Sequence, residues 1–140
     1  MLADYDATVY TESGDPVKLS DIANGRPLVI NFWATWCPYC IKELPDLKAI
    51  FEDYGDRVSF AFVDCADGRR ETVEGAKAWL AENGFDDLPA YYDTDLAASG
   101  AFAARSLPTT AVVSADGKIL GSAPGVVDPA GLRAVLDTLV

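Results

Sequence analysis

Two cysteines stand three positions apart in the segment Cys37-Pro38-Tyr39-Cys40. A cysteine at the start of a helix faces unpaired N–H groups and the positive end of the helix dipole, which favour the thiolate over the thiol. Its pKa is then expected to fall below the free value of about 8.5. We therefore expect Cys37 to be a nucleophile of thiol–disulfide exchange and Cys40, one turn into the helix, to resolve the mixed disulfide. Pro38 and Tyr39 form the turn between them.

The composition limits the alternatives. The chain has three cysteines and no histidine, which excludes Ser–His and Cys–His catalysis within it. A structural zinc site would need a carboxylate as its fourth ligand, an uncommon set. Two incidental buried cysteines, or half of a metal site, remain as other interpretations of the pair. We expect no metal and no cofactor beyond a redox-active disulfide between Cys37 and Cys40.

The dithiol needs a strand and a helix to position it. The near-continuous apolar run 28–33 after Arg26-Pro27 predicts a buried central strand. A helix is predicted from Pro38 to about Tyr54, where Gly55 follows as a natural stop. Pro45 lies inside this helix and should kink it, because proline lacks the backbone N–H that the helix needs.

The remaining chain alternates between strand and helix patterns. We expect strands over 58–63 and 88–92, helices over 71–83 and 95–105, a hairpin of strands 109–114 and 118–122 around Asp116-Gly117, and a last helix capped by Asp128. Such an order predicts an α/β fold with a central mixed β-sheet flanked by helices. We expect one domain over residues 1–140, with residues 1–16 as an irregular N-terminal segment.

Charge and hydropathy restrict the partners and the location. The formal net charge of −11 argues against nucleic acid and anionic membranes as partners, because both would repel the domain. No apolar run approaches the length that spans a bilayer. Residues 1–6 lack the basic and apolar regions of a signal peptide, so we expect either a cytoplasmic protein or one whose targeting segment is absent from this chain.

A family resemblance covers residues 17–140. The run from Phe32 to Cys40 (Phe-Trp-Ala-Thr-Trp-Cys-Pro-Tyr-Cys) resembles the active-site signature of thioredoxin-fold oxidoreductases. Pro45 stands where that family has its helix-kinking proline, and the segment 107–110 (Leu-Pro-Thr-Thr) resembles its cis-proline loop. The resemblance implies a thioredoxin-like fold, a cis bond before Pro108 and a substrate-binding role for three residues, Leu107, Pro108 and Thr109.

The subfamily follows from an insertion. Val63 and Pro108 are 45 positions apart, enough for an extra helix and strand before the cis-proline loop. This resembles the TlpA-type (TlpA/ResA/DsbE-like) subfamily of bacterial extracytoplasmic oxidoreductases, many of which act as reductases, for example toward apocytochrome c. The resemblance implies protein thiol or disulfide substrates, a membrane or soluble electron donor, and a place in the periplasm or cell envelope. We further expect a monomer.

Two positions depart from thioredoxin itself. Asn31 stands where thioredoxin carries a buried Asp, and Asn cannot accept and release a proton. The TlpA-type group often has a Glu three residues past the second cysteine, which is Glu43 here. Our hypothesis is that Glu43 accepts the proton that activates Cys40; the alternative is an exposed helix Glu. The dipeptide Pro38-Tyr39 is that of glutaredoxins, although no Gly-Gly glutathione-binding element follows the hairpin.

Two further residues lie near the dithiol. We expect Trp36, directly before Cys37, to form part of the docking surface instead of the core, which we assign to Trp33. We expect Cys65, at the end of the second buried strand, to be a bystander thiol, with an auxiliary redox role as the alternative.

Three other functions would use the same residues or the same kind of fold. A disulfide oxidase or isomerase would use the same residues with a more oxidising couple. A non-catalytic thioredoxin-like binding module usually lacks one or both cysteines. A peroxidase needs a Thr-x-x-Cys start, and Thr35-Trp36-Cys37 has the wrong spacing.

Overall fold

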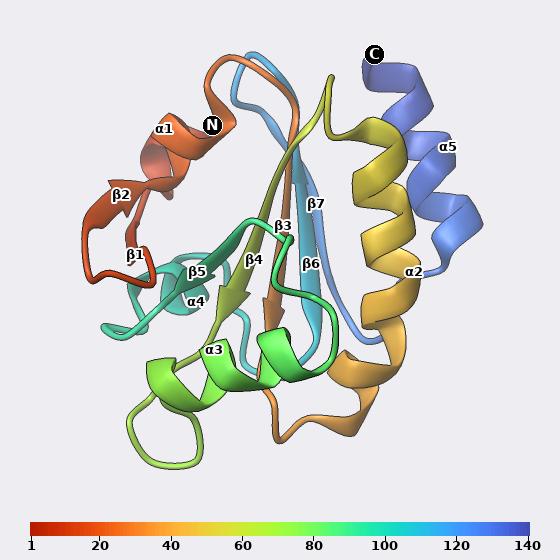
Figure 1. Cartoon of the computed structure of the whole chain (residues 1–140). Helices are drawn as coiled ribbons and strands as arrows, with labels where there is room; N and C mark the ends of the chain where they lie inside the picture. Colours follow the sequence, from red (N-terminus) through yellow and green to blue (C-terminus); the bar gives the residue numbers. More distant parts are fainter.

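A seven-stranded mixed sheet forms the centre of the computed structural model, which describes residues 1–140 (Figure 1). The strand order is β2-β1-β5-β4-β3-β6-β7. The strands are β1 (Thr8–Tyr10), β2 (Pro16–Lys18), β3 (Leu28–Trp33), β4 (Ser59–Asp64), β5 (Ala90–Tyr92), β6 (Thr109–Val113) and β7 (Ile119–Pro124). The neighbours β3–β4 and β4–β5 are parallel and the other pairs antiparallel, which confirms the predicted mixed sheet.

Helices cover both faces of this sheet. They are the 3-10 turn η1 (Leu2–Asp4) and the helices α1 (Leu19–Ala23), α2 (Pro38–Tyr54), α3 (Val73–Glu82), α4 (Ala97–Ala101) and α5 (Pro129–Leu139). One apolar cluster joins the sheet to α2, α3 and α5, and a second joins its other face to η1, α1 and α4. Figure 1 shows α2 and α5 side by side on one side of the sheet. None of these helices combines the length and the apolar character that a membrane-spanning helix requires.

The central strand β3 places the residues that matter for the site. Successive side chains of a strand point to opposite faces. Val29 and Trp33 accordingly join the cluster under α2, whereas Ile30 and Phe32 join the opposite one. Asn31 shares the face of Val29 and Trp33 and therefore meets α2. All six residues of β3 are buried, as the apolar run predicted.

The inserted helix and strand lie between β4 and the cis-proline loop, as predicted. They are α3 and β5, followed by the short helix α4. The helix α3 begins at Val73 and not at Glu71, because the Thr72 hydroxyl accepts the Gly75 N–H at 3.1 Å and so caps the helix there. The helix predicted over 95–105 is shorter and spans only Ala97–Ala101.

The N-terminal segment is more regular than expected. We expected residues 1–16 to be irregular, but they contain η1 and β1, and β2 begins at Pro16. The prediction was wrong because β1 is stabilised by pairing with other strands and not by a pattern of its own residues. It pairs with β2 on one side and, through Tyr10, with Tyr92 of β5 on the other.

Candidate active site

The two cysteines lie where β3 passes into α2. Cys37 has an extended backbone and caps the helix, Pro38 is the first helical residue, and Cys40 lies in the first turn. The structure joins Cys37 and Cys40 in a disulfide, with their Cα atoms 5.3 Å apart. The Cys37 sulfur also accepts the backbone N–H of Cys40 at 3.2 Å. One of the free N–H groups at the helix start is therefore already directed at the sulfur that would carry the negative charge.

The two cysteines are almost equally buried. Cys40 is fully buried and Cys37 is 3% exposed, so access to either depends on the surrounding turn. The side chains beside them are open, since Trp36 is 40% and Tyr39 64% exposed. Trp36 therefore lies on the surface, and Trp33 lies in the core, as predicted.

The cis-proline loop lies beside this turn. The Leu107–Pro108 peptide bond is cis, as the resemblance implied. Tyr39 lines one hollow of about 430 Å³ together with Leu107, Pro108 and the chain around Gly125. Neither the N–H nor the C=O of Leu107 is hydrogen-bonded within the chain, whereas the Pro108 carbonyl accepts the Gly125 N–H at 2.9 Å. The main chain of Leu107 is thus free to pair with an extended polypeptide.

Thr109 is placed differently from its two neighbours. Its side chain is buried, and its hydroxyl donates to the Ser106 carbonyl at 2.7 Å. The side chain of Thr109 therefore closes the loop from inside. A direct contact with substrate is left to the backbone of this segment, and that role stays a prediction.

Glu43 is buried and hydrogen-bonded, and is not an exposed helix residue. One carboxylate oxygen accepts the Asn31 side-chain amide at 3.0 Å, and the other accepts the Val127 N–H at 2.8 Å. The same Asn31 amide nitrogen donates to the Thr110 hydroxyl at 3.1 Å. Burial raises the pKa of Glu43, while the hydrogen bonds from Val127 and Asn31 act in the opposite direction. The carboxyl is thus set up to bind and release a proton closer to neutral pH than an exposed Glu.

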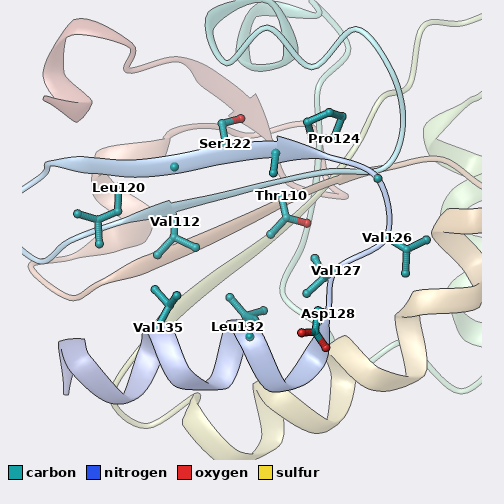
Figure 2. Close-up of a pocket in the computed structure, with 14 residues that line it drawn as sticks. Thr110, Val112, Leu120, Ser122, Pro124, Val126, Val127, Asp128, Leu132 and Val135 are labelled. Atoms are coloured by element: carbon teal, nitrogen blue, oxygen red, sulfur yellow. The ribbon is translucent and has the colours of Figure 1, made fainter.

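An apolar hollow of about 360 Å³ adjoins this network (Figure 2). It lies between the outer strands β6 and β7 and the helix α5. Thr110 and Val127 line it, as do Leu132 and Val135 of α5. Because Thr110 and Val127 also bond the Asn31–Glu43 network, they connect this hollow to the buried carboxylate.

Cys65 has the character of a bystander. It is the one free cysteine and is partly buried just beyond β4. Burial, together with the negative charge of Asp93, raises its pKa to about 12. A thiol with such a pKa carries almost no thiolate at neutral pH.

Sequence reasoning missed one set of residues at this site. Glu71, assigned to a helix, is buried and accepts the Thr35 N–H at 2.7 Å and also the Thr35 hydroxyl. Asp64, at the end of β4, is buried beside it. Nothing in the spacing of these residues signals the contact, because a 35-residue stretch separates Thr35 from Glu71. No group of three or more His, Cys, Asp or Glu side chains is arranged to hold a metal ion.

A mixed sheet with a disulfide at the start of α2 and a cis-proline beside it defines a thioredoxin-fold protein with a redox-active cysteine pair. Residues 3–121 match the AhpC/TSA family, so the chain belongs to that family. It is also similar to the thiol-disulfide oxidoreductase ResA of Bacillus thuringiensis, with 30% identity over 108 residues, 76% of this chain and 59% of that protein. It is 32% identical to the thiol:disulfide interchange protein DsbE of Allochromatium vinosum over 109 residues, 77% of this chain and 56% of that protein.

These relatives confirm the TlpA/ResA/DsbE-like resemblance, and the chain spans less than two thirds of their length. Among solved structures, the exposed lipoprotein thioredoxin Etrx1 of Streptococcus pneumoniae superimposes with a TM-score of 0.81 at 27% identity, over 96% of this chain and 99% of that one. The structural match covers nearly the whole chain and thereby confirms the thioredoxin-like fold.

Proposed function

We propose that this chain reduces protein disulfides through Cys37 and Cys40. The observation that carries the proposal is their disulfide at the start of α2, beside the hollow that Tyr39 shares with Leu107 and Pro108. A non-catalytic binding module has no need of such a pair. The proteins it resembles are named for thiol–disulfide exchange, which supports the same chemistry.

The reaction moves two electrons in two steps. The Cys37 thiolate attacks one sulfur of the substrate disulfide, forms a mixed disulfide and releases the first substrate thiolate, which takes a proton from solvent. The Cys40 sulfur, after losing its proton, attacks Cys37, breaks the mixed disulfide and releases the second substrate thiolate. The products are the Cys37–Cys40 disulfide and a dithiol substrate. An external donor must then reduce the disulfide for another turnover.

Three parts of the site support these steps. The Cys40 N–H and the helix start stabilise the Cys37 thiolate. Glu43, buried with a raised pKa, is proposed to accept the Cys40 proton in the second step. The exposed Trp36 and the free main chain of Leu107 are proposed to dock the substrate polypeptide.

The direction and the location are finer proposals. We infer a reductase of the cell envelope, acting on partners such as apocytochrome c, from the TlpA-type resemblance. One solved relative is described as an exposed lipoprotein thioredoxin, which supports a place outside the cytoplasm. The stabilised Cys37 thiolate also favours the reduced form, and therefore an oxidase is the second candidate. A reduction potential of about −270 mV would indicate a reductant and one of about −120 mV an oxidant.

Insulin reduction with dithiothreitol as donor tests the exchange activity. Cys37→Ser should abolish the acceleration, because no thiolate can attack the substrate. Cys65→Ser is the matched control and should keep the wild-type rate. If Cys37→Ser keeps full turnover, the proposed function is wrong.

A further inference from the structure

A pair of buried carboxyl groups lies behind the active-site turn, apart from Glu43. Asp64 is the last residue of β4, opposite Trp33 of β3, and is fully buried. Glu71 is almost as deeply buried in the loop between β4 and α3. Neither forms a salt bridge, since the ion pairs of the molecule involve Lys48, Arg57, Arg133 and the N-terminus. Buried carboxylates without a cation are costly and call for a physical explanation.

Glu71 is fixed on the segment that leads to the nucleophile. Its carboxylate accepts both the N–H and the hydroxyl of Thr35. Thr35 lies two residues before Cys37, within the turn closed by the Cys37 N–H and the Ala34 carbonyl at 3.2 Å. A backbone N–H can only donate, so this contact requires an acceptor oxygen on Glu71.

A second contact holds the loop that carries Glu71 against the same turn. Asp67 accepts the N–H groups of Arg69 and Glu71, at 2.9 and 3.3 Å, and shapes the loop. The guanidinium of Arg70 stacks on the Trp36 ring at 3.9 Å from its centroid. A displacement of Glu71 would therefore also move the exposed Trp36 beside Cys37.

Asp64 is the second buried carboxyl of the pair. Neither of its buried oxygens has a hydrogen-bond donor in the protein, and Glu71 is the residue whose side chain acts most strongly on its ionisation. Two carboxylates cannot bond each other without a proton between them. Burial, the Glu71 contact and the charge of Asp67 raise the pKa of Asp64 to about 10, so Asp64 is neutral at pH 7 and carries that proton.

The surroundings agree with a single shared proton. The titratable groups around the pair are acids, phenols and thiols with no base among them. They are Cys65 and Asp67 on the same loop, Tyr92 and Asp93 at the end of β5, and, farther out, Glu12 and Glu74. The two cations on this loop, Arg69 and Arg70, are both exposed, and Arg70 interacts with Asp67 at the surface.

We propose that a protonated Asp64 donates its hydrogen to Glu71, and that the pair positions Thr35, Trp36 and Cys37 for thiol–disulfide exchange. Asp64 and Glu71 are then positioning residues that act through Thr35 and do not touch substrate. The inference deepens the proposed function and rests on it, since positioning matters only if Cys37 is the nucleophile.

Alkylation of Cys37 by iodoacetamide in the reduced protein at pH 7, with the labelled site identified by mass spectrometry, tests the positioning role. Glu71→Ala should slow the reaction about tenfold, because a hydrogen bond to a charged group is lost. A role through charge alone predicts the opposite, since removing a nearby negative charge favours the thiolate. Glu74→Ala, at an exposed site on α3, is the control for the same change in net charge.

Two substitutions of Asp64 test the shared proton. Asp64→Leu has no donor for Glu71 and should slow Cys37 alkylation as Glu71→Ala does. Asp64→Asn keeps an N–H donor in the same place and should retain most of the wild-type rate. In the infrared spectrum at pH 7, the wild type should show a protonated carboxyl C=O band that Asp64→Asn lacks.

The outcomes separate this inference from the proposed function. The inference is overturned if Glu71→Ala alkylates as fast as Glu74→Ala or faster, or if the protonated carboxyl band is absent from the wild type. If Asp64→Leu does not fold, the infrared comparison and the Glu71/Glu74 pair still decide. Alkylation needs no protein substrate, and a wild type that fails to reduce insulin would therefore contradict the proposed function alone.

Discussion

Asn31 of β3 donates its side-chain amide to the Glu43 carboxylate of α2 at 3.0 Å. This bond joins the strand that leads into the dithiol to the helix that carries it. Asn31 has no proton to give up at physiological pH, so it can orient Glu43 but cannot itself serve as an acid or a base. The buried acid that thioredoxin carries on the strand is thus placed on the helix here, one turn beyond Cys40.

Replacing Glu43 by Gln tests this division of roles. Burial raises the pKa of Glu43, so the carboxylate is lost at a higher pH than in an exposed Glu, and its function as a base falls as pH drops through that raised value. Glu43→Gln should slow the attack of Cys40 on a mixed disulfide by about 100-fold near neutral pH. The rate is measured as release of 5-thio-2-nitrobenzoate from Cys37 in a stopped-flow instrument.

The control for this experiment is Glu52→Gln, because Glu52 is an exposed residue of the same helix. It should release the thiol at the wild-type rate across the whole pH range. A pH profile for Glu43→Gln that coincides with the wild-type profile would remove Glu43 from the mechanism.

The Asp64 carboxyl predicts a pH dependence of stability. In the unfolded chain Asp64 loses its proton above its ordinary pKa near 3.8, whereas in the folded protein it keeps the proton up to about pH 10. The folded state thus binds more protons between these values, and the free energy of unfolding falls as pH rises through this window. Asp64→Asn removes this contribution, so its stability should exceed that of the wild type by a margin that grows with pH.

Urea unfolding of the oxidised protein at pH 6, 7.5 and 9, followed by tryptophan fluorescence, measures that margin. Asp86→Asn is the control, since Asp86 is exposed and is not among the groups that raise the pKa of Asp64. A constant difference between Asp64→Asn and the wild type at all three pH values would contradict the assigned protonation state.

The sequence allowed the central elements of the fold to be predicted because their signals are local. The apolar run of β3 and the pattern of α2 depend on neighbouring residues, and their bounds agree with the structure. The dithiol and Pro108 were found from short motifs. The pairing of β1 was missed because Tyr10 and Tyr92 are far apart in the chain. The same reason hid the contact of Glu71 with Thr35, which forms only when the loop after β4 folds over the turn before α2.

The core under α2 makes a further prediction about stability. Leu44 is fully buried in the cluster that also contains Cys40 and Trp33. Leu44→Ala should lower the free energy of unfolding by about 2–5 kcal/mol, because it removes buried methyl groups and leaves a cavity. Leu120→Ala, at a site 43% exposed on β7, should change it by less than about 0.5 kcal/mol. Urea unfolding measures both, and equal losses would contradict the assigned packing.

Cys65 should be inert while the protein is folded. Burial raises its pKa to about 12, and only the thiolate attacks a disulfide reagent, so less than about one molecule in 10,000 is reactive at pH 7.5. The double variant Cys37→Ser/Cys40→Ser should therefore release almost no colour with 5,5′-dithiobis(2-nitrobenzoate) in buffer. In concentrated guanidinium chloride it should release one equivalent at once, since unfolding restores the ordinary pKa. Rapid reaction of the folded double variant would show that Cys65 is accessible as a thiolate. That result would favour the alternative, an auxiliary redox role for Cys65.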